Sequence, residues 1–523
     1  MNAITSIVMS VTATCHARTA LALASGLVLA GCAVGPDYQR PGMPVPDRWA
    51  SVGAMTPASQ PELAQWWTRL NDPLLDALID QAVAGNLDVA TARAKVREAR
   101  ALYRQAAGTA WPSLRGSVSG TRSGGSGRMS PGASSTTSST TSSTTSPTTN
   151  INPGTGSAGD LFQAGFDASW ELDLFGANRR AQEAAKYGVD AAQWGLNAAL
   201  LTLIGDVTSS YVQARGYQAR LALARDTAAS QEETARITRL KFEAGASSGL
   251  DAANAAGQAQ STRAAIPAFE AAYAQTVHGL SVLTGQPPEA LLDRMEQPQP
   301  LPTPTLPVSL GVPADVLLAR PDVRLAERRY AQSTAKVGQA EAARYPSVSL
   351  TGSLITSATR PGDLGQRSSI GWSFGPSLTV PLFNGGRLKA GVEVAQAERD
   401  QSFIAWRAAV LNALKDVEGA SVALYQENER IAALRASAAS YRTAADLARL
   451  LYRAGSTSFL DVLTAERSLY LAEDALIQSR VLFTTHYVAL NKALGGGWNG
   501  HIDTSTPEVV DAHTGPHLDT TRD

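Results

Sequence analysis

The sequence predicts an α+β membrane protein, in which short alternating strands are followed by very long helices. Three observations support this class: an internal repeat, four segments of alternating polarity, and two proline-free runs of nearly 70 residues. Helices of that length do not fit in one globular domain. Four strands are too few to close a membrane barrel, and lipid does not tolerate an open sheet edge. If the strands cross a membrane, several chains must therefore share one barrel.

The repeat is clearest in two segments that lie 210 positions apart. Residues 239–251 read RLKFEAGASSGLD, and residues 449–461 read RLLYRAGSTSFLD. The identical positions include Arg239 with Arg449, Gly245 with Gly455, Ser248 with Ser458, Leu250 with Leu460, and Asp251 with Asp461. Each half is predicted to contain a helix, a strand, a loop, a second strand, a long helix, a glycine turn and a returning helix.

Residues 1–31 are typical of an export signal. An apolar stretch at residues 20–30 follows Arg18, and small residues lead directly to Cys32. This resembles a bacterial lipobox, in which the Cys32 thiol is acylated and the chain is cut before it. A covalent lipid on Cys32 is then the only attached group that we expect, with no other cofactor. The alternative is an ordinary signal peptide followed by a chance cysteine.

Composition excludes several classes of protein. The net charge is −1 and charged residues make up 17% of the chain, so no basic surplus indicates a nucleic-acid partner. Beyond the signal, no run of 18 apolar residues predicts a transmembrane helix. Any membrane crossing by the mature chain must therefore use strands.

Strands are predicted at residues 113–120, 161–174, 347–354 and 370–382. Between residues 162 and 174 the even positions are apolar and the odd positions are polar, which gives the segment one face of each kind. The polar loops of the two hairpins are residues 121–159, rich in Ser, Thr and Gly, and residues 355–369. This pattern suits an outer-membrane barrel. A soluble sandwich with one wet face is the alternative.

Long helices are predicted at residues 177–244 and 387–454, each on the order of 100 Å at 1.5 Å per residue. They end at Gly245 and Gly455, which favours turns at residues 245–249 and 455–459. Ser247 or Ser248, and Thr457 or Ser458, are candidates to cap the returning helices. Asp251 and Asp461 then lie in the first turn, where the helix dipole favours a carboxylate. A free coiled-coil dimer is the alternative, but it does not account for the strands.

The predicted organisation has six parts: the signal at 1–31, a lipidated N-terminal segment at 32–64, a first repeat at 65–297, a Pro-rich linker at 298–312, a second repeat at 313–496, and a polar tail at 497–523. The tail is expected to be mobile and to carry no chemistry.

Several motifs together resemble the TolC-like outer-membrane efflux factors, in particular the lipoprotein branch of OprM/NodT type. The match covers essentially the whole mature chain, and its most specific motifs are CAVGPDY at 32–38, WW at 66–67, DPL at 72–74, WELDLFG at 170–176, LGVPADVLLARPDVRLAE at 310–327 and PLFNGGR at 381–387.

The resemblance implies a homotrimer in the outer membrane of a Gram-negative bacterium. Each chain would give four strands to a twelve-stranded β-barrel, which a long α-helical tunnel continues through the periplasm. The implied partners are a periplasmic membrane-fusion adaptor, an inner-membrane pump of the resistance-nodulation-division type, and outer-membrane lipid. The implied function is passive conduction of drugs or other small solutes that the pump delivers.

The resemblance also implies a gate at the helical tips. Asp461 is similar to an aspartate that forms a ring in the closed channel, and Tyr452 to a tyrosine that ties the closed state; Asp251 is a third gate candidate. Thr457 and Thr464 stand where relatives have an arginine and a second aspartate, which leaves the number of rings open. Asp461 could instead be a plain helix-start carboxylate. The second hairpin is the one expected to move, and the adaptor-docking candidates are Arg239, Gly245, Ser248, Leu250, Arg449, Gly455, Ser458 and Leu460.

No enzyme is predicted, because none of the six His forms a recognisable catalytic pair with a carboxylate, and no metal site is predicted. Two alternatives remain for the function. The same duct could export proteins, as in type I secretion, or metals. A structural envelope lipoprotein could use the long helices as a spacer. Neither the cargo nor the identity of the pump and adaptor is specified by the sequence.

Overall fold

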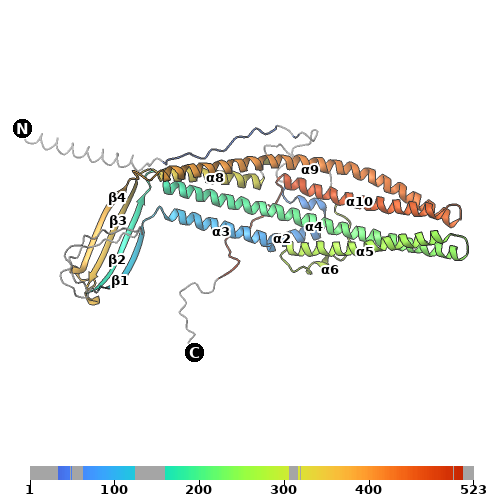
Figure 1. Cartoon of the computed structure of the whole chain (residues 1–523), viewed down its shortest axis with the longest axis horizontal. Helices are drawn as coiled ribbons and strands as arrows, with labels where there is room; N and C mark the ends of the chain where they lie inside the picture. The colour runs from blue at the N-terminus through green and yellow to red at the C-terminus, as the bar shows by residue number, and fades with distance from the viewer. Residues whose placement is uncertain are drawn as a thin grey trace, which may run out of the picture. The chain divides into compact units, whose positions relative to one another are not determined.

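The computed structural model describes residues 33–46, 49, 63–123, 159–304, 316–317, 320–498 and 500–510 (Figure 1). The signal, Cys32, most of the loop at 121–159, part of the linker and the end of the tail lie outside the described residues. Two compact units are present. Unit one comprises Met1–Pro36, Arg104–Gln182 and Ala335–Ala395, and unit two comprises Asp37–Tyr103, Glu183–Thr334 and Gln396–Asp523.

Unit one contains one sheet of four antiparallel strands in the order β1-β2-β3-β4 (Figure 1). The strands are β1 (Ser113–Ser123), β2 (Gly159–Leu172), β3 (Ser347–Ala358) and β4 (Ile370–Thr379). Strands β1 and β2 form the hairpin of the first half, and β3 and β4 form that of the second. Because β2 pairs with β3, the two halves of the chain build a single sheet.

The strand ends differ from the sequence-based limits for local reasons. Strand β1 runs three residues further, to Ser123, because those residues pair with the start of β2. Strand β2 stops at Leu172, and the Asp173 carboxylate then accepts hydrogen bonds from the backbone N–H groups of Asn178 and Arg179, at 3.1 and 2.8 Å. Strand β4 stops at Thr379, shortly before Pro381, which has no N–H to extend a ladder.

The register of the strands gives the sheet two chemically distinct faces. Phe166 is paired with Leu354, and Leu354 with Trp372, so large apolar side chains continue across three strands. These side chains are exposed in the single chain. The odd positions of β2 and their neighbours form the other face, which is polar; there, the hydroxyl oxygens of Ser353 and Ser373 lie 2.7 Å apart. The alternation predicted from the sequence is therefore carried across the whole sheet.

The segment that follows Cys32 lies against this unit. The N–H of Val34 donates to the carbonyl of Phe175, just after β2, at 3.1 Å. Gly35 has a φ of 90°, and a Cβ atom there would lie 2.4 Å from the Cα of Gly338, so only glycine fits this close approach.

Nine α and 3₁₀ helices account for most of the remaining described residues: the 3₁₀ helix Trp66–Leu70, α2 (Pro73–Gly85), α3 (Leu87–Gly108), α4 (Ala177–Glu243), α5 (Gly249–Leu283), α6 (Leu292–Met295), α8 (Pro321–Ala342), α9 (Arg387–Arg453) and α10 (Phe459–Ala493). Helices α4 and α9 each have 67 residues. Among the described residues, no helix is both long enough and apolar enough to span a bilayer.

The main core of unit two joins α2 to α4 and α10. Its fully buried side chains include Trp66, Leu75, Ile204, Tyr211, Tyr487 and Leu490. Helices α4 and α10 approach closely at Gly216, where a Cβ atom would lie 2.4 Å from Cγ2 of Val481. Further along, the Arg220 guanidinium pairs with Asp474, with Nε and Oδ1 2.6 Å apart. An apolar contact and an ion pair thus hold α10 along α4.

The C-terminal segment differs from the prediction of a mobile tail at residues 497–523. Residues 500–510 are not a free tail, because Arg97 of α3 donates to the carbonyl of Thr506 at 2.7 Å and Arg93 pairs with Glu508. The partners are about 410 residues apart in the sequence, so local composition gave no sign of this docking.

Candidate functional site at the hairpin tips

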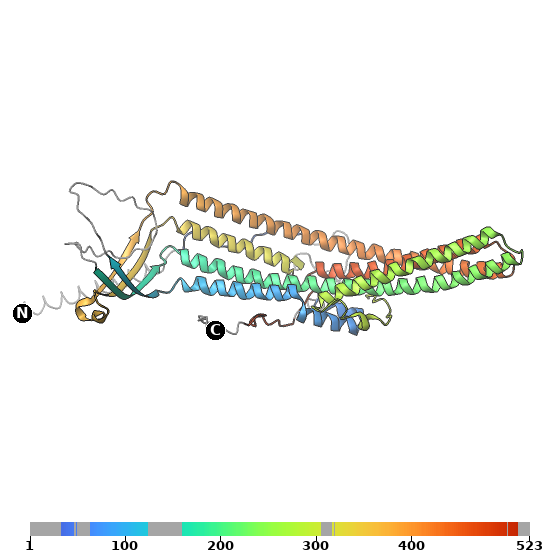
Figure 2. The ribbon, with the colours of Figure 1, turned by 60° about the horizontal axis from the view of Figure 1, so that its bottom comes forward.

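The long helices α4 and α9 each end in a glycine turn, and the two turns lie together at one end of unit two (Figures 1 and 2). Gly245 has a φ of 73° and Gly455 a φ of 76°, a region that favours glycine. The N–H of Ala246 donates to the carbonyl of Lys241 at 2.7 Å, and that of Ser456 to the carbonyl of Leu451 at 2.9 Å. These bonds close the last turn of each helix in the same way.

The returning helices α5 and α10 begin with matching capping boxes. The Ser248 hydroxyl accepts from the N–H of Asp251, and the Ser458 hydroxyl from the N–H of Asp461. Each carboxylate accepts in return from the N–H of its serine, at 3.2 and 3.1 Å. Of the serine and threonine candidates at each turn, Ser248 and Ser458 are thus the N-caps.

Hydrogen bonds lower the pKa of both carboxyl groups. The Thr457 hydroxyl, at 2.6 Å, and the Ser458 hydroxyl, at 2.7 Å, lower the pKa of Asp461. Bonds from Ser248 and Ser247 lower the pKa of Asp251. Both groups are therefore ionised at neutral pH, and in the single chain the Asp461 residue is exposed.

Tyr452 connects the second tip to the first hairpin. Its side chain is only 8% exposed and its hydroxyl lies 3.2 Å from Oγ1 of Thr238 on α4. The Lys241 ammonium donates to the carbonyl of Tyr452 at 2.8 Å and lies 3.8 Å from the centre of its ring. Phe459 packs edge-to-face on the same ring, with centroids 5.9 Å apart. Tyr452 is thus held by hydrogen bonding, cation–π attraction and aromatic packing.

A second connection lies one turn further from the tip, at Glu466 of α10. This residue is 4% exposed, and its Oε1 accepts from Nε of Arg449 at 2.8 Å and from the Thr234 hydroxyl at 3.4 Å. Arg449 thus contacts Glu466 and remains 27% exposed, and its role in docking the adaptor stays a prediction. Its counterpart Arg239 is exposed and, among the described residues, pairs with Glu243 at 3.0 Å.

Glu466, Thr238 and Lys241 were missed by the sequence analysis. Glu466 did carry a signal, because it follows Phe459 and Val462 at spacings that place it on the same buried face of α10. A carboxylate in a buried stripe requires a partner. Thr238 and Lys241 carried no comparable signal.

Both tips carry exposed leucines. Leu250 and Leu460, in the first turns of α5 and α10, are exposed, as are Leu240 and Leu450 near the ends of α4 and α9. Gly245, Ser248, Gly455 and Ser458 are also exposed. The docking candidates thus present exposed residues at both tips, and Arg449 is partly exposed.

The family model described as "Outer membrane efflux protein" matches residues 78–286 and 312–496. The chain belongs to this family. Nodulation protein T of Rhizobium leguminosarum bv. trifolii is 36% identical over 477 residues, covering 90% of this chain and 96% of that protein. The cation efflux system protein CusC of Escherichia coli (strain CFT073) is 31% identical over 477 residues, covering 90% and 97%. The solved outer-membrane channel OprN is 32% identical with a TM-score of 0.79, covering 89% of this chain and all of that one.

This outer membrane efflux protein is therefore an efflux channel of the outer membrane and not an enzyme. The resemblance and the function inferred from the sequence motifs are confirmed. Family membership also favours a channel over the structural envelope lipoprotein.

Proposed function

We propose that this channel is a homotrimer in which three four-stranded sheets close one twelve-stranded barrel and the long helices continue it as a tunnel. The main support for this proposal comes from the four-stranded sheet. One of its faces is apolar and exposed, and the outer edges of β1 and β4 pair with no other strand among the described residues. An unsatisfied backbone group costs several kcal/mol in lipid, so β4 of one copy is expected to pair with β1 of the next.

The covalent lipid is proposed on Cys32. Its neighbours Val34 and Gly35 lie beside the residues that follow β2, at Phe175, and beside Gly338. An acyl chain on Cys32 would add membrane affinity through each buried methylene. We expect Cys32→Ser to abolish acyl labelling while the barrel still inserts. Acyl label on that variant would contradict the assignment.

We propose that the tips form the gate and that the second hairpin opens it. The contacts of Tyr452 with Thr238 and Lys241, and of Glu466 with Thr234, hold α9 and α10 to α4. In a trimer, three copies of Asp461 would form a ring at the constriction, with Asp251 nearby. We expect Asp461→Ala to raise ion flux and weaken block by trivalent cations, because clustered carboxylates attract cations. Unchanged flux and block would reject the ring.

The docking surface for a periplasmic membrane-fusion adaptor is proposed at the exposed leucines of both tips, Leu250 and Leu460 among them. An inner-membrane pump of the resistance-nodulation-division type would supply the energy, so that the channel conducts passively. Drugs or other small solutes are the proposed cargo. The similarity to a cation efflux protein makes metal export the second candidate.

The mass of the purified assembly and its conductance test this function together. We expect the mass of three chains and a steady single-channel current in planar bilayers. A stable monomer with no conductance would contradict the shared barrel. Pairing between copies can be tested by cysteines at facing positions of β4 and β1, which should cross-link only between chains.

A further inference from the structure

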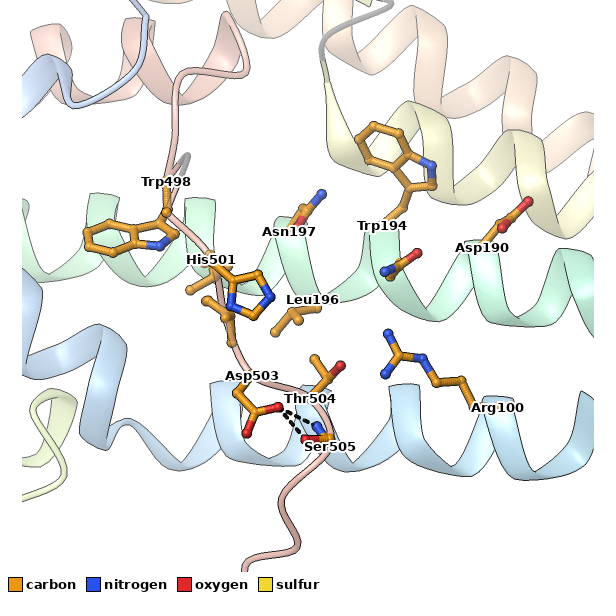
Figure 3. A pocket seen from close by; sticks show the side chains of 14 residues that line it. Arg100, Asp190, Trp194, Leu196, Asn197, Trp498, His501, Asp503, Thr504 and Ser505 are labelled. Atoms are coloured by element: carbon orange, nitrogen blue, oxygen red, sulfur yellow. Dashed lines mark hydrogen bonds between the residues drawn. The ribbon is translucent and has the colours of Figure 1, made fainter.

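A polar cleft on unit two is distinct from the tips. It lies between α3, the beginning of α4 and the C-terminal segment, with a volume of about 570 Å³, in the range of small-molecule sites (Figure 3). The side chains on which the argument rests are Arg100, Asp190, Gln193, Trp194, Trp498 and His501.

The C-terminal wall of the cleft is preformed. The Asp503 carboxylate accepts from the N–H of Ser505 at 2.8 Å and from the Thr506 hydroxyl at 2.6 Å. Arg97 of α3 donates to the carbonyl of Thr506 at 2.7 Å. Because these bonds already fix the backbone, a ligand would not have to order this segment on binding.

Two polar side chains of the cleft have no partner. Arg100 and Gln193 make no hydrogen bond or ion pair with any described residue, whereas Asp190 forms a long ion pair with the Arg328 guanidinium, at 4.0 Å. In Figure 3, Arg100 extends from α3 toward α4. The Gln193 amide and the Asp190 carboxylate can hydrogen-bond to hydroxyl or amide groups of a ligand. The Arg100 guanidinium can bind a carboxylate through two parallel hydrogen bonds.

Two indole rings flank these groups. Figure 3 shows Trp194 and Trp498 at opposite ends of the cleft, with His501 between them. Trp498 is stacked on Trp67, with ring planes 5° apart and centroids 6.3 Å apart, which fixes its orientation. Large, rigid aromatic faces supply apolar contact area beside polar groups. They suit the C–H faces of sugar rings.

The charged side chains of the cleft limit the class of ligand that it can bind. The cleft holds one guanidinium, that of Arg100, and two carboxylates, those of Asp190 and Asp503, and this balance does not favour a polyanion such as a nucleotide. A purely apolar drug would remove water from the polar groups without replacing their hydrogen bonds, which would weaken its binding. We propose that this cleft binds a glycan of acetamido sugars that carries carboxylates. Arg100 would bind a carboxylate, Asp190 and Gln193 the hydroxyl and acetamido groups, and the two indoles the sugar rings.

Two envelope polymers share this chemistry, the cell-wall glycan and the saccharide of lipopolysaccharide. Purified full-length channel in detergent should be titrated calorimetrically with cell-wall disaccharide-peptide fragments and, separately, with lipopolysaccharide core oligosaccharide. We expect saturable binding of the cell-wall fragments. Binding of the core oligosaccharide alone would overturn the cell-wall source and keep the ligand chemistry.

The variants Trp194→Ala and Arg100→Gln should each weaken binding at least tenfold. Arg104→Gln, one turn further along α3, and Trp111→Ala, an exposed indole outside the cleft, should leave it unchanged. No binding of either saccharide, or equal loss in the control variants, would overturn the proposal. So would dissociation of the assembly by Trp194→Ala, because the cleft would then be an interface between copies. The titration requires no pump or bilayer, so its failure is separate from a failure of the channel function.

Discussion

The turns at residues 245–249 and 455–459 have the same backbone but different surroundings. Gly245 and Gly455 have nearly equal φ angles, and Ser248 and Ser458 cap the returning helices with the same pattern of bonds. The side chains beside them differ. Tyr452 is 8% exposed, whereas Phe242, at the matching position of the first copy, is 47% exposed.

The difference in exposure between Tyr452 and Phe242 shows that the residues of the repeated segment have two different roles. Shared residues build the turn, and residues that differ, together with the shared Arg449, decide what the second tip packs against. Phe459 replaces Gly249 and completes a small apolar cluster with Tyr452 and Val462. The second hairpin is therefore tied to α4 by its own side chains, and the first tip supplies the surface to which it is tied.

The largest expected effect comes from removing the two matched aromatic rings. Tyr452→Ala should lower the local opening free energy of the second tip by about 3–5 kcal/mol, because it empties a buried site. Phe242→Ala should cost less than about 1 kcal/mol, since its ring is already half exposed. Amide hydrogen exchange over residues 449–466 measures both changes. Equal losses in the two variants would contradict the difference in packing.

The matched arginines provide a second contrast. Arg449→Ala leaves the buried Glu466 carboxylate without its cation, and we expect a loss of about 2–3 kcal/mol because Arg449 itself is 27% exposed. Arg239→Ala removes an exposed pair and should cost at most about 1 kcal/mol. The double variant Arg449→Ala, Glu466→Gln should recover part of the loss. Identical costs for the two single variants would show that Glu466 does not depend on Arg449.

The matched serines should behave alike. Ser248→Ala and Ser458→Ala each remove an N-cap, for which we expect about 1 kcal/mol of local stability. Serine-to-threonine variants at the same positions serve as controls that keep a capping hydroxyl. A large difference between the two tips would mean that their capping boxes are not equivalent.

The smallest effect is the pH dependence of the second cap. Because hydrogen bonds lower the pKa of Asp461 in the folded tip, its stabilising contribution is complete above the unfolded value of about 3.9 and is lost as pH falls through the lower folded value. Asp461→Ala should therefore destabilise the tip at pH 7, and its effect should shrink as pH falls through the folded pKa of Asp461. Exchange rates, corrected for the intrinsic effect of pH, provide the comparison. A difference that persists at low pH would rule out this origin.

Short-range patterns predicted much of this molecule. Alternation located the strands, and Gly245 and Ser248 located a turn and offered its cap, because these features depend on neighbouring residues. The limits of β1 depended on pairing with β2, which the local pattern did not specify. The partners of Tyr452 and Glu466, and the docking of residues 500–510, join positions far apart in the chain. Such contacts depend on how helices pack against one another, and local sequence patterns do not specify that packing.

The central claim is that contacts specific to the second tip hold the channel closed. Single-channel current in planar bilayers tests it directly, with the double variant Tyr452→Ala, Arg449→Ala compared with its first-tip counterpart Phe242→Ala, Arg239→Ala. The account predicts a several-fold higher conductance for the second-tip variant and a wild-type conductance for the first-tip variant. Equal conductance of the two double variants, whether raised or unchanged, would contradict it.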